Sequence, residues 1–417
     1  MVKAYENVEQ VDYPNPKLAE LVQCPYGYYA ELRESRPVHR LPSGDYVISR
    51  YEDCIEVVNR PEDFSNRFGP AIPGFAEASG VDLESGLDAE IDPWPSPLND
   101  SPHHTKKRAL LLALVRRDRM VSYSAMIQGV VDQLIDKFAH RGIVEFRSEF
   151  AEHLPALVIL KVFGVPDKDE ALIRSWMSKF QGHAFRHSSA LQQKEQIEAV
   201  TMAKEYFARA LTGRVSAPRE DFLSDLVQAK LSRDGTLHMH ALLSEIIVGY
   251  QAAIHNTVNM IVNTMYLLLR HPDQMARVCA EPSMLQNAIE EALRVASPVQ
   301  WIQRIAARDI EMHGVTIPKG SLILLHFGSA NHDSTKFSEP EEFRITRPNI
   351  HAHLAFGYGG HKCLGMPLAR LEARIAFESL FSRLKNFRFA EGKSEVRYLY
   401  SPNKRALEAL HVQFDPA

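Results

Sequence analysis

The chain has 417 residues, of which 45% are hydrophobic and 24% are charged, and its 48 Lys and Arg residues against 52 Asp and Glu residues give a formal net charge of −4. This composition is that of an ordinary globular protein and excludes a disordered, collagenous or coiled-coil chain. The near balance of charge gives no overall attraction to nucleic acid or to an anionic membrane, so we expect neither as a partner.

The cysteines and the first residues of the chain indicate in which cellular compartment the protein is found. Cys24, Cys54, Cys279 and Cys363 lie far apart and no CxxC pair occurs, which excludes zinc-ribbon and thioredoxin-type sites. Residues 1–16 are polar and contain no apolar run, so we expect no signal peptide. The reducing cytoplasm is the expected location.

The first hundred residues predict a small sheet and a long loop. Residues 45–50, and those just before them, predict two short strands joined by a turn over residues 42–44. Residues 69–102 are rich in proline, glycine and acidic side chains, with Phe75 and Trp94 among them. Loops of that length inside a compact domain are usually functional or disordered.

From about residue 103 to 296 the pattern is helical. Residues 238–270 predict one helix of roughly 50 Å at about 1.5 Å per residue. Uncharged polar residues interrupt its segment 246–269, which favours a buried helix over a membrane span. Ser283 and Gln286 predict a capping box ahead of a further amphipathic helix.

After Pro298 the pattern changes to strands over residues 305–327, with turns at Gly314 and at residues 318–320. An irregular segment, one more helix over about 367–384 and a stranded tail follow. The expected fold class is therefore mainly helical (α+β) with small peripheral sheets. No repeat and no linker rich in Gly and Ser divides the sequence, so we expect a single domain over residues 1–417.

The densest chemical signal is residues 356–370, where three glycines precede Cys363. Glycine allows the backbone to fold tightly around the sulfur, and Pro367 suits the first turn of a helix. The free N–H groups and the dipole of a helix N-terminus favour a thiolate. Such a sulfur suits a soft metal and above all haem iron. The alternative for a lone cysteine is a buried structural residue.

The same string matches the pattern Phe-x-x-Gly-x-His-x-Cys-x-Gly at Phe356, Gly359, His361, Cys363 and Gly365. It resembles the haem-binding loop of the cytochrome P-450 family of haem-thiolate monooxygenases, in its soluble bacterial class. The resemblance implies the cytochrome P-450 fold around a buried haem b (iron protoporphyrin IX), with Cys363 as the iron ligand and Phe356 and Gly365 beside the cofactor. It also implies insertion of one oxygen atom from O2 into a small or medium organic substrate.

A second segment is Glu291 and Arg294, which are three residues apart and can share a helix face. It resembles the family's Glu-x-x-Arg structural element, which braces the haem-side core together with a basic residue from the irregular segment. Arg347 is the candidate for that third residue. The position before Phe343, where many relatives carry Arg, holds Glu342 here. An exposed salt bridge is the alternative for the pair.

A third segment holds His104 and Arg108, four residues apart and able to reach the same anion from one helical face. By resemblance these two residues bind the haem propionates, together with Arg304 and His361. Two buried carboxylates require cationic or N–H partners. Surface cations are the alternative.

The long helix departs from the family where protons reach bound oxygen. Aligned with the family's Ala-Gly-x-acid-Thr-Thr, residues 252–257 place His255 at the acid position and Asn256 at the alcohol position. Asn has no ionisable hydroxyl, whereas His can carry protons near neutral pH. A shift of one residue would bring Thr257 nearer the alcohol role. A helix that is merely buried is the other alternative.

Because of this departure, two further functions stay open. The chain could use H2O2 as a peroxygenase or peroxidase, or it could be a non-catalytic haem-binding protein. Whichever holds, the substrate pocket is expected to involve the loop 69–102 and a set of apolar and amide side chains. These are Val248, Gln251, Ala252, His255, Asn256, Val299 and Gln300.

A cluster of Lys and Arg side chains indicates which kind of protein donates the electrons. Within its own stretch the cluster is opposed only by Asp118, and an acidic ferredoxin would be steered to it. Nothing in the chain resembles a flavin or iron–sulfur domain, so a separate ferredoxin and ferredoxin reductase are the expected partners. A solvated helix face is the alternative. The cluster consists of Lys106, Lys107, Arg108, Arg116, Arg117 and Arg119.

Overall fold

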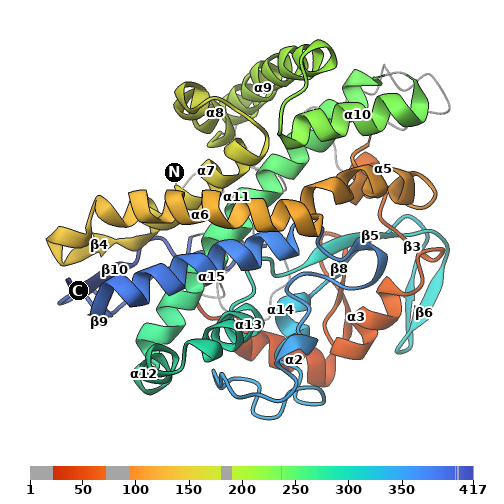
Figure 1. Cartoon of the computed structure of the whole chain (residues 1–417). Coiled ribbons are helices and arrows are strands. Elements are labelled where there is room, and N and C mark those ends of the chain that lie inside the picture. Colours follow the sequence, from red (N-terminus) through yellow and green to blue (C-terminus); the bar gives the residue numbers. More distant parts are fainter. Residues whose placement is uncertain are drawn as a thin grey trace. The chain divides into compact units, whose positions relative to one another are not determined.

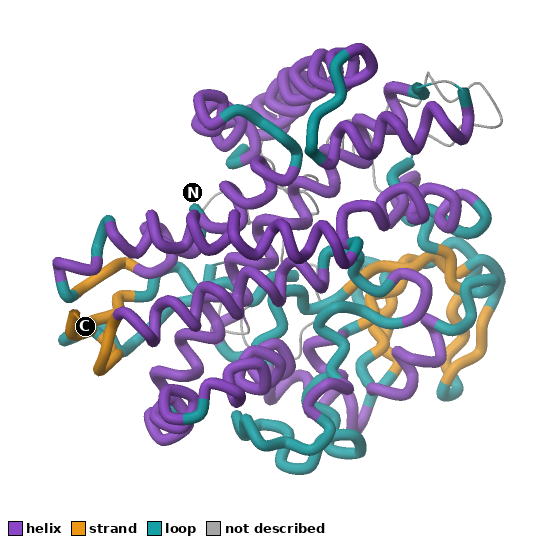
Figure 2. The backbone as a smooth tube through the Cα atoms, viewed as in Figure 1, coloured by secondary structure: helices purple, strands orange, loops and turns teal. Residues whose placement is uncertain are grey.

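The computed structural model describes residues 22–71, 94–179, 190–235, 237–399, 401 and 403–416 (Figure 1). Helices make up most of these residues and the strands are short (Figure 2). The chain divides into two compact units. Among the described residues, the first unit takes those of 65–120 and 156–254, and the second takes those of 22–64, 121–155 and 255–416. The single domain over residues 1–417 stays a prediction.

The first unit is helical in its described part, and its longest helix, α11, continues into the second unit. No helix within the described ranges offers an apolar stretch that would suffice to cross a bilayer. The helical segments are η2 (Gly69–Ala71), η4 (Ser96–Leu98), α5 (His103–Leu111), η5 (Leu112–Val115), most of α7 (Leu154–Val162), η8 (Asp167–Asp169), α8 (Glu170–Met177), α9 (Ala190–Ser216), α10 (Phe222–Asp234) and the first half of α11 (Met239–Arg270).

The ends of α10 show how local chemistry fixes this unit. Asp221 caps the helix, since its side chain accepts a hydrogen bond from the backbone N–H of Ser224 at 2.8 Å, and Gly235 ends it at φ +69°. The same carboxylate accepts from Arg214 Nη2 at 2.7 Å. Gly164 lies so close to Asp221 that a Cβ at position 164 would collide with the carboxylate. Position 164 therefore requires glycine.

The second unit contains the sheets. The five-stranded sheet has the order β1-β2-β8-β5-β3, in which β1 and β2 are antiparallel, β2 and β8 parallel, and β8 and β5 antiparallel. The three-stranded sheet has the order β4-β10-β9, and β6 pairs with β7. The strands are β1 (Val38–Arg40), β2 (Tyr46–Ile48), β3 (Phe64–Ser65), β4 (Ile143–Glu145), β5 (Ile302–Ala306), β6 (Ile310–Met312), β7 (Val315–Ile317), β8 (Leu322–Leu325), β9 (Leu384–Phe389) and β10 (His411–Pro416).

Helices cover these sheets. α6 and α15 lie side by side (Figure 1), and Gln128 of α6 donates to Ser379 of α15 at 2.8 Å. The helical segments are α2 (Tyr26–Ser35), α3 (Tyr51–Val58), most of α6 (Arg117–Asp136), η6 (Ala139–Arg141), η7 (Arg147–Ala151), the second half of α11, α12 (Pro272–Ala280), η10 (Pro282–Met284), α13 (Leu285–Val295), α14 (Phe327–Ala330), η11 (Ile350–Ala352), η12 (Gly359–His361) and α15 (Met366–Arg383).

One hydrophobic core joins the large sheet to the segment that precedes Cys363. Ile48 of β2, Leu325 of β8 and Phe337 are completely buried in it, and Leu354 is the last of its buried residues along the chain. Burial of such side chains stabilises a fold by roughly 1.5–3 kcal/mol each. The cysteine loop therefore starts from a fixed point.

Most of the predicted elements are confirmed. β1 and β2 pair across a turn that contains Gly44 at φ +91°, and turns with positive φ occur at Gly314 and Gly320. The long helix is α11, which starts one residue later than predicted. The strands after Pro298 begin with β5 at Ile302, three residues earlier than expected.

Two predictions are wrong. α13 begins at Leu285 behind Met284, and no side chain caps it, so Ser283 and Gln286 form no capping box. A 3-10 turn that starts at Pro282 leads into the helix instead. The helical pattern also missed β4, because this strand is specified by its pairing with β10 near the other end of the chain. Local periodicity contains no information about such a distant partner.

Candidate active site

Cys363 lies on a loop that backbone geometry holds in place. Its N–H donates to the carbonyl of Phe356 at 2.8 Å, which closes the loop. Gly357 and Gly359 adopt φ +72° and +66°, values that L side chains rarely tolerate. A Cβ on Gly359 would also lie 3.0 Å from Val58 Cγ1 of α3. Position 359 therefore needs glycine for two separate reasons.

The cysteine sulfur stands at the start of α15. The helix begins at Met366 with Pro367 in its first turn, as predicted, and Ala369 N donates to Gly365 O at 2.9 Å. A Cβ on Gly365 would lie 4.0 Å from Cys363 Sγ, which is an ordinary van der Waals contact, so Gly365 is adjacent to the sulfur. Free N–H groups at this end of the helix favour an anionic sulfur.

The four cysteines differ in exposure. Cys54 is completely buried, its thiol donates to the carbonyl of Ile48 at 3.6 Å, and burial raises its pKa. Cys54 thus has the environment of a buried structural cysteine, which is the alternative that the sequence analysis left for Cys363. Cys363, by contrast, is exposed. Its sulfur is therefore accessible to a ligand in a way that Cys54 is not.

A haem fits this donor set. Within the residues described, no group of three or more His, Cys, Asp and Glu side chains could hold a metal ion by itself. Cys363 can supply one thiolate ligand. Haem iron suits a single protein thiolate, because the porphyrin nitrogens leave only axial positions for the protein.

The four predicted propionate ligands are divided between the units. In the first unit, His104 and Arg108 lie on α5 and His104 is buried. Burial, and then the positive charge of Arg108, lowers the pKa of His104. In the second unit, Arg304 of β5 is buried with its Nη1 donating to Gln303 O at 2.6 Å, and His361 of η12 is half-buried. A carboxylate beside His104 and Arg108 would pair with Arg108 and favour the protonated form of His104.

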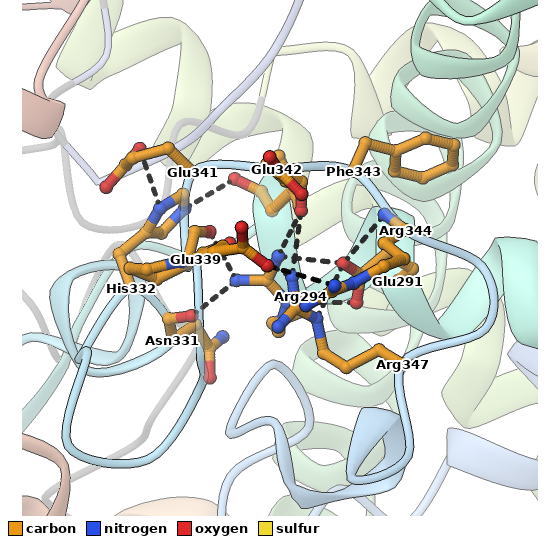
Figure 3. A network of polar contacts seen from close by, with 12 residues as sticks. Glu291, Arg294, Asn331, His332, Glu339, Glu341, Glu342, Phe343, Arg344 and Arg347 are labelled. Carbon is orange, nitrogen blue, oxygen red and sulfur yellow. Dashed lines mark hydrogen bonds and ion pairs between the residues drawn. The ribbon is translucent and has the colours of Figure 1, made fainter.

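The Glu-x-x-Arg pair is buried, not exposed (Figure 3). Glu291 Oε1 accepts from Arg294 Nη2 at 2.8 Å and from Arg347 Nε at 2.9 Å, and all three side chains have no exposed surface. The structure therefore brings together the three residues that the sequence grouped. The Glu342 side chain takes no part in these ion pairs, although its backbone carbonyl accepts from Arg294 at 2.8 Å.

This cluster also fixes the irregular segment. Arg294 Nη1 donates to the carbonyls of Asn331 and Pro340 at 2.9 and 2.7 Å. Arg347 Nη2 donates to the carbonyl of Glu342 at 3.0 Å. Buried charges are tolerated when their hydrogen-bonding groups are satisfied in this way. The residues between β8 and the cysteine loop are thus held by two guanidinium groups.

A second buried cluster, which the sequence analysis missed, ties α13 to the cysteine loop. Glu290 accepts from Arg370 Nε at 2.7 Å and from His353 Nε2 at 3.0 Å. Burial alone would raise the pKa of Glu290, but these two partners lower it to about 2. The Arg370 guanidinium lies 4.9 Å from the ring centroid of Phe356. No local pattern signals this cluster, because Glu290 and Arg370 are 80 residues apart.

The middle of α11 holds the residues aligned with the family's proton relay. His255 is exposed, although the residues from Thr257 to Met265 that follow it are buried. Protein atoms nevertheless desolvate its ring, and this desolvation, with the positive charges of Lys404 and Arg147, lowers the pKa of His255 to about 4. His255 is therefore neutral at neutral pH. Thr257 is buried.

Asn256 has a partner that the sequence analysis did not foresee. Its Oδ1 accepts a hydrogen bond from Lys404 Nζ at 2.8 Å. Desolvation lowers the pKa of Lys404 to about 8. The two residues are 148 positions apart, so no spacing in the sequence indicates the contact.

The predicted pocket residues differ in what they can offer a substrate. Val248 and Val299 are half-buried and Ala252 is exposed. Gln251 Nε2 is buried and has no hydrogen-bond partner within the described part of the chain. Gln300 is already committed within the protein, because it accepts from Tyr29 OH at 2.7 Å and donates to Ser297 O at 2.7 Å.

The predicted loop lies largely outside the described residues, since 72–93, with Phe75, are not among them. At its described ends, Gly69 lies directly against the ring of Trp94.

The cation cluster is partly neutralised. Arg119 makes three hydrogen bonds to Asp225 of α10, at 2.7 and 2.6 Å from Nη2 and 3.0 Å from Nε. Arg116 pairs with Asp118 at 2.8 Å. Lys106 and Arg117 are exposed. The sequence count missed Asp225 because it lies 106 residues from Arg119.

Comparison with known proteins agrees with this site. A family model described as Cytochrome P450 matches residues 157–401. Cytochrome P450 107B1 of Saccharopolyspora erythraea is 33% identical over 391 residues, which cover 92% of this chain and 94% of that protein. The cytochrome P450 monooxygenase PikC of Streptomyces venezuelae is 32% identical over 400 residues, with coverages of 94% and 91%. The solved structure of P450BioI in complex with hexadec-9Z-enoic acid ligated acyl carrier protein matches with a TM-score of 0.83 at 29% identity, over 95% of this chain and 100% of that chain.

The mainly helical fold and the cysteine loop ahead of α15 agree with these matches. The chain belongs to the cytochrome P450 family. It is similar to bacterial members, and it is an oxidoreductase of the monooxygenase type. Membership implies a haem-iron cofactor. The resemblance, the fold class and the enzyme class that the sequence predicts are thereby confirmed.

Proposed function

We propose that the protein is a haem-thiolate monooxygenase that holds haem b through Cys363 and inserts one oxygen atom from O2 into a small or medium organic substrate. The observation that carries this proposal is the exposed Cys363 on its glycine-constrained loop at the start of α15. When bound, a thiolate-liganded haem supplies the electron density that favours O–O cleavage. The protein provides binding, orientation and proton control.

The side chains described above have separate tasks in this proposal. His104, Arg108, Arg304 and His361 hold the propionates, while Phe356 and Gly365 line the sulfur side. Glu291, Arg294 and Arg347 keep the preceding segment in place. His255, which is neutral, accepts and returns a proton at its ring nitrogen, and Asn256 and Thr257 orient water or substrate beside it. Gln251 Nε2 donates to a polar group of the substrate.

Electrons come from a ferredoxin and its reductase in the cytoplasm. The exposed cations Lys106 and Arg117 support the proposal, because an acidic partner would be attracted to them. One structural neighbour holds hexadec-9Z-enoic acid on an acyl carrier protein. A carrier-bound acyl chain therefore belongs among the substrates to be tried.

The test of the proposal is ligation. The purified, dithionite-reduced protein should form a carbon monoxide complex with the Soret band of a thiolate-ligated haem, and Cys363→Ala should lose that band. Cys54→Ala is the matched control, since its thiol is buried, and it should keep the band. A thiolate-type carbon monoxide spectrum in the Cys363→Ala variant would refute the assignment.

A second function has one observation in its favour. A neutral imidazole at position 255 can accept a proton from H2O2. We therefore propose peroxygenase or peroxidase activity as the alternative. Product formation from H2O2 without ferredoxin, abolished by His255→Ala, would establish it. Turnover only with O2 and electrons would eliminate it.

A further inference from the structure

Lys404 lies in a segment whose backbone is fixed on both sides. Gln300 N donates to Asn403 O at 2.9 Å and Arg405 N donates to Pro298 O at 3.1 Å, with Val299 and Lys404 paired between them. The neighbours Asn403 and Arg405 are buried. The side chain of Lys404 therefore starts from a rigid position next to Val299, a predicted pocket residue.

The Lys404 ammonium reaches the centre of the proposed site. Nζ lies 2.8 Å from Asn256 Oδ1, on the helix turn that also carries His255. An ammonium group has three donors and no acceptor, so it must face the carbonyl end of the amide. This contact sets the orientation of Asn256. It occupies one of the three N–H donors, and the described residues offer no protein acceptor for the other two.

Charge around this point is unbalanced. No carboxylate among the residues described forms an ion pair with Lys404, and the lowering of its pKa comes from desolvation. The ionisable groups that act on His255 are Lys404 and Arg147, and both are basic. Arg147 has its own partners, Glu152 at 3.0 Å and Asn259 at 3.1 Å. A desolvated cation beside a neutral amide is costly, and an anion would offset that cost.

We propose that Lys404, held by Asn256, binds the carboxylate of an organic acid and so determines the substrate class of this site. The inference rests on the proposed function, because it assigns the substrate of that same site. The carboxylate accepts from the two remaining Nζ–H groups. The carbon skeleton then extends from an anchor fixed to the turn of α11 that carries His255. A neutral analogue of the same shape lacks the charge that compensates the ammonium.

The experiment compares matched acids and amides on the haem-loaded protein. The probes are decanoate with decanamide and 4-phenylbutyrate with 4-phenylbutanamide, titrated by calorimetry and by the shift of the Soret band. In the wild type at pH 7, the acid of at least one pair should bind about tenfold more tightly than its amide, as a charge-assisted hydrogen bond allows. Lys404→Met should remove that preference and leave the binding of the amide unchanged. Lys319→Met, an exposed lysine, is the control and should keep it.

The pH dependence of acid binding by the wild type tests the same inference without a variant that could misfold. The advantage of the acid should be full at pH 7 and should fall as the pH rises above about 8, because the ammonium then loses its proton. A bound acid stabilises the protonated form, so the fall occurs at higher pH in the complex than in the free protein. His255 stays neutral over this range and therefore does not mimic the effect.

Three results would overturn the inference. They are equal binding of acid and amide in every pair, no binding of either acid, and an acid preference that survives in a folded Lys404→Met variant. Calorimetry needs no spectral change of the haem, so the two proposals can fail separately. Loss of the thiolate-type carbon monoxide band in the wild type would refute the proposed function. A normal band without acid preference would refute only the role of Lys404.

Discussion

Two parts of the second unit treat charge in opposite ways. In the cluster of Glu291, Arg294 and Arg347 every charged group is buried and has its partner. Around Asn256, a lysine is desolvated against a neutral amide and a histidine is held neutral. The first arrangement holds a segment in place, and its charged groups are already paired with one another. The second retains unused donor capacity, which is what a binding or catalytic site requires.

The largest effect is expected from breaking the saturated cluster. Glu291→Ala leaves Arg294 and Arg347 buried without a counter-charge, and removal of one partner from such a cluster costs about 3–5 kcal/mol. Urea unfolding should show this loss of stability together with weaker haem retention. Glu378→Ala breaks the exposed pair with Arg374 and should cost less than about 1 kcal/mol. Equal losses in the two variants would mean that burial of the cluster has no energetic weight.

The next effect concerns the unsaturated region. If His255 handles protons, His255→Ala should divert electrons to peroxide and lower product formed per NAD(P)H by roughly tenfold or more. Because its pKa is about 4, the histidine stays neutral from pH 5.5 upward. The wild type should therefore show no titration near the ordinary imidazole value of about 6.5. Unchanged coupling in His255→Ala would exclude the histidine from proton transfer.

Glu372 sharpens the comparison, since it is a buried acid without the partners that Glu291 has. It lies on α15, its Oε2 makes no hydrogen bond to any residue that the structure describes, and burial raises its pKa well above the ordinary value of 4.5. The folded state thus binds a proton that the unfolded state releases, so Glu372 costs stability as the pH rises above 4.5.

Glu372→Gln should therefore stabilise the protein by about 1–3 kcal/mol at pH 7, with little effect at pH 4. Urea midpoints measured at both pH values test the prediction. A variant that is destabilised at pH 7 would show that Glu372 has an unrecognised cationic partner.

The smallest effect is expected at the surface. Lys106→Glu with Arg117→Glu should slow reduction by an acidic ferredoxin about tenfold at low salt and flatten the dependence of the rate on ionic strength. Reduction by dithionite should not change. Arg116→Glu, whose charge is already paired with Asp118, should have a smaller effect. If the double variant keeps both rate and salt dependence, these cations are only a solvated face.

The sequence predicted well the turns, helix ends and motifs that depend on residues close together in the chain. The turn at Gly44, the bounds of α11 and the start of α15 with Pro367 in its first turn all follow from local chemistry. Cys363 was singled out because glycines precede it at the family's spacing, and its role as the metal ligand stays a prediction. Arg347 was found because the resemblance indicated that a third basic residue was needed.

The sequence could not predict the pairings between distant residues. Glu290 with Arg370 and Asn256 with Lys404 are joined by the fold alone, across 80 and 148 residues. The same holds for β4, which forms because β10 lies beside it. The choice of partner for a charged side chain depends on the whole packing arrangement, and no helical or strand periodicity encodes it.

The contact between Gly359 and Val58 has a consequence for the order in which the molecule is built. The cysteine loop lies against α3, and β2 pairs in parallel with β8, so the beginning of the chain supports a loop near its end. Contacts between residues so far apart in sequence form slowly, because a long loop must first close. During synthesis the α3 side of this contact therefore exists long before the loop that it shapes. Incorporation of the cofactor is then a late event, because it requires that the cysteine loop has already packed against α3.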